Sequence, residues 1–101
     1  MSRKKKDASK KDTAVSRIKQ MEKVFDKAII LIDNASEDMD ALIAYQNEIK
    51  KLEEYYTGNL WKEDFALDEA GKLPEDLKRG VLSEDGIYNL LERNRELLEE
   101  I

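Results

Sequence analysis

The chain has 101 residues, of which 41% are hydrophobic and 41% are charged, and it contains one Pro, four Gly, no Cys and no His. This length supports one domain, and the composition is typical of long helices with a charged surface. The absence of Cys and His excludes disulfides, thiolate metal sites and His-based catalysis, and we expect a cytoplasmic protein. The longest apolar run, residues 28–32, is too short to cross a membrane.

The charge is distributed unevenly along the chain. Residues 1–20 hold eight basic and two acidic side chains, a net charge of +6, whereas residues 21–101 hold ten basic and 21 acidic ones, a net charge of −11. Three interpretations of the basic arm remain open: a solvated tail, a clamp on an acidic surface of its own dimer, or a nucleic-acid contact. In the last case the phosphate-contacting residues are Arg3, Lys4, Lys5, Lys6, Lys10 and Lys11, with Arg17 and Lys19 beyond them.

Residues 1–12 have no apolar periodicity, and we predict that they form a disordered arm before a single helical domain at 13–101. From Thr13 onward an apolar stripe advances in steps of three and four residues, with one shortened step before Tyr45. This spacing predicts the seam of a coiled coil. Its members are Ile18, Met21, Phe25, Ala28, Ile32, Ala35, Met39, Leu42, Tyr45, Ile49, Leu52 and Tyr56.

Residues 13–56 form either one helix or a helical hairpin broken near 33–36, where the weakest helix formers lie and Asn34 with Glu37 resembles a capping box. We favour one helix, because the stripe crosses this point without losing its phase. Such a helix of 44 residues is about 66 Å long, too long for the remaining residues to cover. If it does not break, a second copy must cover it, which predicts a homodimer through the Ile18–Tyr56 seam.

The C-terminal half contains several helix-ending signals. Gly58 is placed to adopt the left-handed conformation that ends a helix. Residues 61–70 predict a short helix that Gly71 stops, and residues 74–79 predict another, opened by Pro74 and closed by Gly80. Ser83 caps a final helix whose predicted buried face is Ile87, Leu90, Leu91, Asn94, Leu98 and Ile101. With no strand expected anywhere, the predicted fold is all-α: a long N-terminal helix or hairpin packed by short helices and a C-terminal helix.

The second half of the chain also carries distinctive strings of residues. They are KLEEYY (51–56), W-x-x-D-F (61–65), DEAGKLPEDLKRGVLSEDGIYNLL (68–91) and RNRELLE (93–99). In these strings the chain resembles a family of short bacterial and phage proteins, the domain of unknown function DUF4298. The resemblance implies a small helical protein with no assigned activity, and it offers no catalytic or cofactor-binding residue to transfer.

Aromatic residues gather at the junction between the long helix and the C-terminal segment. They form either a small core that holds the loop or an exposed recognition patch. Lys78 and Arg79 lie beside this junction, where they pair with Asp64, Asp68 or Asp76, or receive the carboxylate or phosphate of a partner. The candidate partner-binding residues are therefore Tyr55, Tyr56, Trp61, Phe65, Lys78, Arg79 and Tyr88.

Other polar residues give weaker indications. Asp64 and Asp68 lie one helical turn apart, but the calcium-loop spacing and the Glu-x-x-His motif are both missing, so we predict no metal, no cofactor and no catalytic site. Asn94 either fixes the register of packed helices or faces water at the edge of the core, and we favour the second interpretation.

The sequence therefore predicts a non-enzymatic module for protein–protein interaction or oligomerisation, with an unknown protein partner and no membrane contact. The alternative is an accessory nucleic-acid or ribosome binder that acts through the basic arm. The acidic charge of the remaining chain argues against an extensive nucleic-acid interface.

Overall fold

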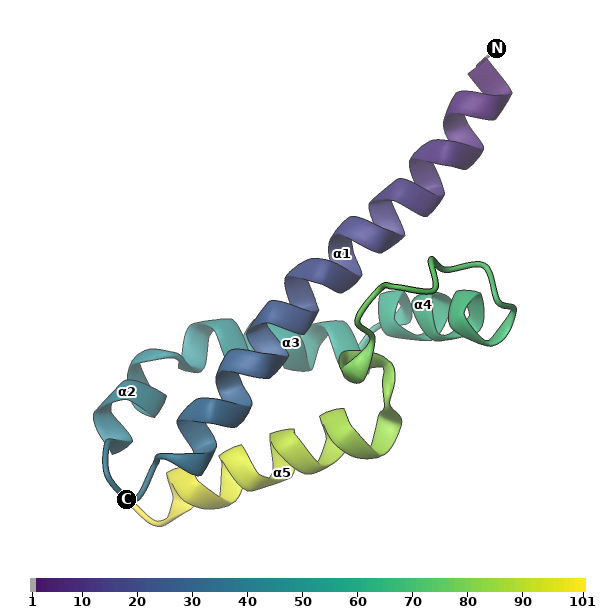
Figure 1. Cartoon of the computed structure of the whole chain (residues 1–101). Coiled ribbons are helices and arrows are strands. Elements are labelled where there is room, and N and C mark those ends of the chain that lie inside the picture. The colour runs from purple at the N-terminus through teal and green to yellow at the C-terminus, as the bar shows by residue number, and fades with distance from the viewer. Residues whose placement is uncertain (1) are drawn as a thin grey trace.

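The computed structural model describes the backbone of residues 2–101 and the side chains of residues 12–101. No strand occurs among these residues, and the predicted all-α fold with a long N-terminal helix is confirmed. In chain order the elements are α1 (Ser2–Asp33), α2 (Met39–Ala44), α3 (Gln46–Thr57), α4 (Asn59–Glu69), the 3-10 helix η1 (Gly80–Leu82) and α5 (Glu84–Glu99), as Figure 1 shows.

Helices α1, α3 and α5 form the centre of the fold, since each of them contacts the other two. Helix α2 packs on α1, while α4 packs on α3 and η1. In Figure 1 the turn between α1 and α2 lies at the same end of the molecule as the C-terminus. The fold is elongated, with principal extents of 54 × 24 × 22 Å, because α1 is much longer than the helices that cover it.

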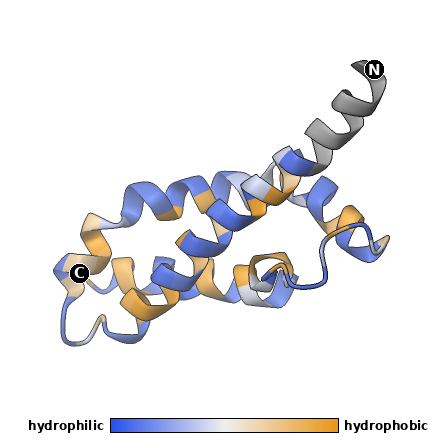
Figure 2. Cartoon of the chain, turned by 45° about the horizontal axis from the view of Figure 1, so that its top comes forward, coloured by the Kyte–Doolittle hydropathy of each residue, from blue (hydrophilic) through white to orange (hydrophobic). Residues whose placement is uncertain are grey.

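The core is built from apolar side chains that every helix contributes. Apolar and polar positions alternate along each helix in Figure 2, which is the pattern of helices that bury one face and expose the other. The largest fully enclosed apolar side chains are those of Ile18, Leu42, Leu52, Val81 and Ile87. Within the described part of the chain, no helix is both long enough and apolar enough to cross a membrane.

The chain turns back after α1, so our preference for one helix across residues 13–56 is wrong and the hairpin alternative is correct. Helix α1 ends at Asp33, and the backbone N–H groups of Glu37 and Asp38 donate to the carbonyl of Asn34 at 3.0 and 2.9 Å. Asp38, rather than Asn34, caps the next helix by accepting a hydrogen bond from the Ala41 N–H at 3.1 Å. The apolar stripe keeps its phase because Ala35 is buried within the turn itself.

This turn removes the reason for expecting a dimer through the Ile18–Tyr56 seam. Seam residues before and after the turn, among them Ile18, Phe25, Ile32, Leu42 and Leu52, are buried within one chain. The returning α2–α3 segment and α5 supply the cover that the length argument assigned to a second copy.

Two boundaries of the predicted helices also differ. Helix α1 begins at Ser2 rather than at Thr13, because its first residues include no Gly or Pro and are rich in the good helix formers Lys and Ala. The separate status of a 1–12 arm stays a prediction. Gly58 has φ −92° and is extended rather than left-handed. Its glycine is explained instead by space, since a Cβ there would lie 3.0 Å from the Glu54 carbonyl oxygen.

Gly71, by contrast, ends α4 with φ +68°, as expected of a left-handed helix terminus. Its N–H donates to the Asp68 carbonyl, and the Lys72 N–H donates to the Leu67 carbonyl, both at 3.0 Å. This pair of bonds is a Schellman motif, which satisfies two carbonyls that a helix end otherwise leaves unpaired.

The predicted helix at 74–79 is absent. The backbone makes a single turn there, with the Leu77 N–H donating to the Pro74 carbonyl at 3.2 Å, and a 3-10 helix follows at Gly80–Leu82. The physical reason lies in Arg79, whose guanidinium donates to the carbonyls of Pro74 (2.5 Å) and Leu77 (3.2 Å). These bonds hold the segment in an open turn.

The start of α5 agrees with the sequence, and parts of its buried face do not. The Ser83 hydroxyl accepts a hydrogen bond from the Gly86 N–H at 3.2 Å, so the predicted cap is confirmed. Ile101, expected in the core, is 72% exposed because the helix ends at Glu99. Asn94 is buried rather than facing water, since it exchanges two hydrogen bonds with Gln46 at 2.8 and 3.0 Å.

Candidate functional site

The predicted aromatic junction is mainly a small core rather than an exposed patch. Trp61 is buried, stacks on Phe65 and meets Tyr56 edge-on, with 5.1 Å between ring centroids in both pairs. The Trp61 indole N–H donates to the carbonyl of Val81 at 3.0 Å, which joins α4 to η1. Tyr88, in contrast, is 52% exposed on α5. The aromatic residues therefore fix the position of α4 and η1, and Tyr88 alone stays largely exposed.

A fully buried carboxylate lies behind this junction. Asp64 on α4 accepts hydrogen bonds from the Arg17 guanidinium on α1, at 2.9 and 2.5 Å, and from the Tyr55 hydroxyl on α3, at 2.7 Å. We call these three residues the Asp64 network. The hydrogen bond to Asp64 raises the pKa of Arg17, which therefore remains a cation, while burial, reinforced by the same carboxylate, raises the pKa of Tyr55. The network is thus a paired charge with a neutral phenol donor.

The Asp64 network changes two predictions. Arg17 is engaged inside the fold and is removed from the residues proposed to contact phosphate. Asp64 and Asp68 were the candidate carboxylate pair, yet each is engaged by an arginine, Asp64 by Arg17 and Asp68 by Arg79. Among the described residues, no group of three or more acidic side chains is placed to hold a metal ion. The other arm residues (Arg3, Lys4, Lys5, Lys6, Lys10 and Lys11) lie outside the described side chains.

A second buried carboxylate anchors η1 to α1. Glu22 is 8% exposed, and one of its oxygens accepts a hydrogen bond from the Val81 N–H at 2.8 Å. Its other oxygen comes close to Gly80, where an added Cβ would lie 3.2 Å away. Burial raises the pKa of Glu22, an effect that the Val81 bond and Lys78 oppose. The Gly80–Val81 backbone is therefore docked directly on a carboxylate of α1.

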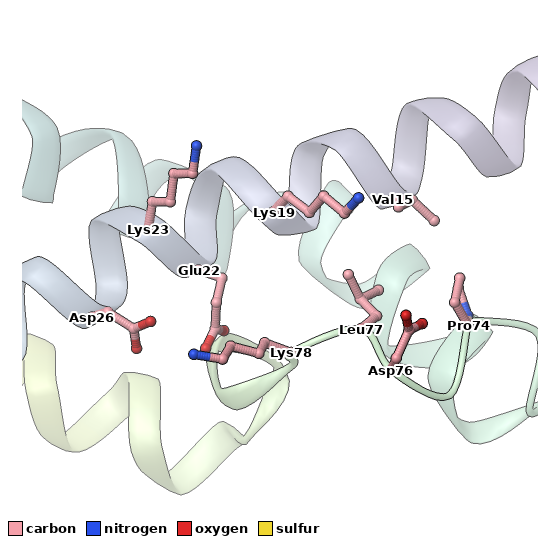
Figure 3. A pocket seen from close by; sticks show the side chains of 9 residues that line it. All are labelled: Val15, Lys19, Glu22, Lys23, Asp26, Pro74, Asp76, Leu77 and Lys78. Atoms are coloured by element: carbon pink, nitrogen blue, oxygen red, sulfur yellow. The ribbon is translucent and has the colours of Figure 1, made fainter.

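These anchors create a groove between α1 and the segment after α4. We call it the α1 groove, and its volume is about 480 Å³. Figure 3 shows side chains entering it from both sides. Its α1 wall carries a stripe that repeats at helical spacing, and the facing wall is the open turn held by Arg79. The lining residues are Val15, Lys19, Glu22, Lys23, Asp26, Pro74, Asp76, Leu77 and Lys78.

The sequence anticipated only part of this site. Of the predicted partner-binding residues, only Lys78 lines the groove, while Arg79 is turned away to Asp68 and the loop carbonyls. Arg17 and Glu22 were missed as structural residues. Their positions carry a faint signal, because both are charged residues on the same side of α1 as the apolar stripe that contains Ile18 and Phe25. A charged residue beside a buried stripe indicates an internal partner.

Comparison with known proteins identifies one family. The profile of the family described as Domain of unknown function (DUF4298) matches residues 18–101, which confirms the resemblance and extends it over most of α1. No curated protein and no solved structure matches the chain. The matched region includes both walls of the α1 groove apart from Val15.

We predict that Asp64→Ala lowers the free energy of unfolding by about 3 kcal/mol, because it leaves the Arg17 cation and the Tyr55 hydroxyl without their acceptor. Urea denaturation measures this loss. The matched control is Asp33→Ala, which breaks the exposed Arg93–Asp33 pair, whose side chains are 56% and 58% exposed. It should change stability by less than about 0.5 kcal/mol. Equal losses in the two variants would contradict a structural role for the Asp64 network.

A second prediction concerns Glu22 and pH. Because the pKa of Glu22 is higher in the folded chain than in the unfolded chain, its stabilising contribution is present at acid pH and is lost as pH rises through the folded pKa. Glu22→Gln keeps the acceptor for the Val81 N–H but cannot titrate. Its stability relative to the wild type should therefore increase between about pH 4 and about pH 7.

Urea denaturation at both pH values tests this prediction. Glu22→Ala serves as the comparison, since it leaves the buried Val81 N–H unpaired and should cost about 1–3 kcal/mol at either pH. If Glu22→Gln and the wild type keep a constant difference across this range, the carboxyl does not titrate as described.

Proposed function

We propose that this chain, which belongs to the DUF4298 family of domains of unknown function, is a non-enzymatic module that binds another protein through the α1 groove. The observation that carries the proposal is the composition of the groove. Apolar side chains of Val15, Pro74 and Leu77 lie within a border of charged ones. An apolar centre with a polar rim is the usual anatomy of a protein–protein contact.

The charges around the groove also support an external partner. Lys19, Lys23, Asp26, Asp76 and Lys78 form no ion pair with any residue whose side chain the structure describes, whereas the arginines and acids behind the groove are paired. Groups that are paired internally hold the fold together. Groups that remain on the rim are available to set the orientation and the rate of an encounter.

A non-enzymatic role is supported by how the polar groups are used. Throughout the described part of the chain, every buried side-chain nitrogen or oxygen has a hydrogen-bond partner. The carboxylates of Asp64 and Glu22 accept bonds from an arginine, a phenol and a backbone N–H. Both are therefore used as structural acceptors rather than held as a free base beside the groove.

A second candidate function is nucleic-acid binding through the arm. It is favoured by the continuity of α1, because one helix carries the basic residues before Asp12 and continues through Lys19 and Lys23. Phosphate contacts of lysine and arginine need no fixed geometry and supply most of the affinity for non-specific sites. Arg17 does not contribute to this surface, because it is paired with Asp64.

The proposed protein contact is tested by site-specific photo-crosslinking in the native cell. A photoreactive amino acid is placed at Lys23, on the rim of the groove, or at the exposed Lys51 on α3, which does not line it. We expect a crosslinked protein of defined mass from position 23 and not from position 51. No product from position 23, or the same products from both positions, would overturn the proposal.

For the second candidate, we predict that the full chain binds a nucleic-acid duplex with an affinity that falls about a thousandfold between about 50 and 200 mM salt, if all six basic residues of the arm contact phosphates. Deletion of residues 1–12 should abolish this binding. Fluorescence anisotropy measures both effects. Undetectable binding at low salt, or binding that survives the deletion, would exclude the arm as a phosphate-contacting element.

A further inference from the structure

The α1 groove also indicates the chemistry of its partner. We infer that it receives an acidic amphipathic helix from another protein, with carboxylates facing Lys19 and Lys23 and an apolar side chain entering between Val15 and Leu77. This inference rests on the proposed function, since it names the partner of the same groove. Three features of the site support it: the distribution of charge, the spacing of the rim lysines and the shape of the two walls.

The acidic groups of the groove are largely neutralised by the chain itself. Glu22 is bound to the Val81 N–H, and both Lys78 and Asp26 lie within electrostatic range of it. Figure 3 shows the Lys78 ammonium group beside the carboxylate of Glu22. On the α1 rim, by contrast, Lys19 and Lys23 have no acidic partner among the described side chains. The unbalanced charge of this rim is therefore positive, although residues 21–101 as a whole carry a net charge of −11.

The spacing of these lysines matches a helical ligand. Lys19 and Lys23 are separated by one turn, a rise of about 6 Å along α1. Acidic residues three or four positions apart on a partner helix lie on one face at the same spacing. The groove stripe from Val15 to Asp26 extends for about 16 Å, or three turns. That length suits the docking of an amphipathic helix through its apolar face.

The facing wall favours a helix over an extended strand. It is a short, turned segment that includes Pro74, which has no N–H to donate, and the carbonyls of Pro74 and Leu77 already accept from Arg79. Little backbone is thus left for pairing with an added strand. Asp76 lies on this wall and repels carboxylates, so the acidic edge of the partner must face α1. The arrangement therefore sets the orientation of the bound helix.

The inference is tested with three synthetic helical peptides, each about 14 residues long. The first carries an apolar Leu stripe flanked by Glu, the second replaces every Glu with Lys, and the third replaces the Leu stripe with Ser. Each is titrated into the full isotope-labelled chain, and the amide NMR signals are followed. We expect only the first peptide to shift the signals of residues 15–26 and 74–78.

Charge variants make the test specific. Lys19→Glu with Lys23→Glu should weaken binding of the acidic peptide at least about tenfold, because two attractive contacts become repulsive. The matched control, Lys50→Glu with Lys51→Glu on α3, changes the net charge equally and should leave the affinity within about twofold. Equal binding of the acidic and basic peptides, equal losses in both variants, or shifts outside the groove would overturn the inference.

Two further results separate this inference from the proposed function. If position 23 crosslinks a protein in the cell but the acidic peptide does not bind, the groove is a contact surface and our assignment of its partner is wrong. If the chain associates with itself through the groove, with signals at 15–26 broadening as its concentration rises, the occupant is a second copy and the inference is likewise overturned. If neither crosslinking nor peptide binding occurs, both proposals fail.

Discussion

The position of α4 depends on one buried carboxylate. Asp64 is fully enclosed, and it binds Arg17 of α1 and Tyr55 of α3, so a single side chain joins three helices. A buried charge is tolerated only when a partner and hydrogen bonds replace the water that it loses. Since α4 leads into the segment that forms the second wall of the α1 groove, the Asp64 network also determines where that wall lies.

The remaining contacts of the wall follow from this placement. Trp61 binds the Val81 carbonyl and Glu22 binds the Val81 N–H, so both polar groups of one residue in η1 are satisfied by side chains from α4 and α1. Arg79 then closes the loop onto Asp68 and onto two carbonyls of the loop itself. The segment has no regular helix of its own to hold it, and these side chains supply the hydrogen bonds that a helix would have provided.

Local signals in the sequence identified the helices well and their mutual arrangement poorly. Ser83 and Gly71 act on the backbone within three or four residues of themselves, so their roles could be inferred from the sequence alone. The Arg17–Asp64 and Glu22–Val81 contacts join residues 47 and 59 positions apart, and no local pattern encodes such pairs. The turn at residues 34–38 was misjudged for a related reason: a buried Ala35 preserves the apolar stripe whether the chain continues or reverses.

The same division explains why the predicted binding residues and the observed groove overlap so little. Large aromatic side chains attract a functional interpretation, but in a chain of 101 residues they are also the main source of apolar area for a small core. Tyr55 and Trp61 are consequently buried, and their polar atoms are bonded inside the fold. The rim lysines have neither role. Lysine on the rim of an apolar groove, in a chain that otherwise carries excess negative charge, adds nothing to the internal pairing seen here, and this is the physical ground for regarding that rim as a surface directed at a partner.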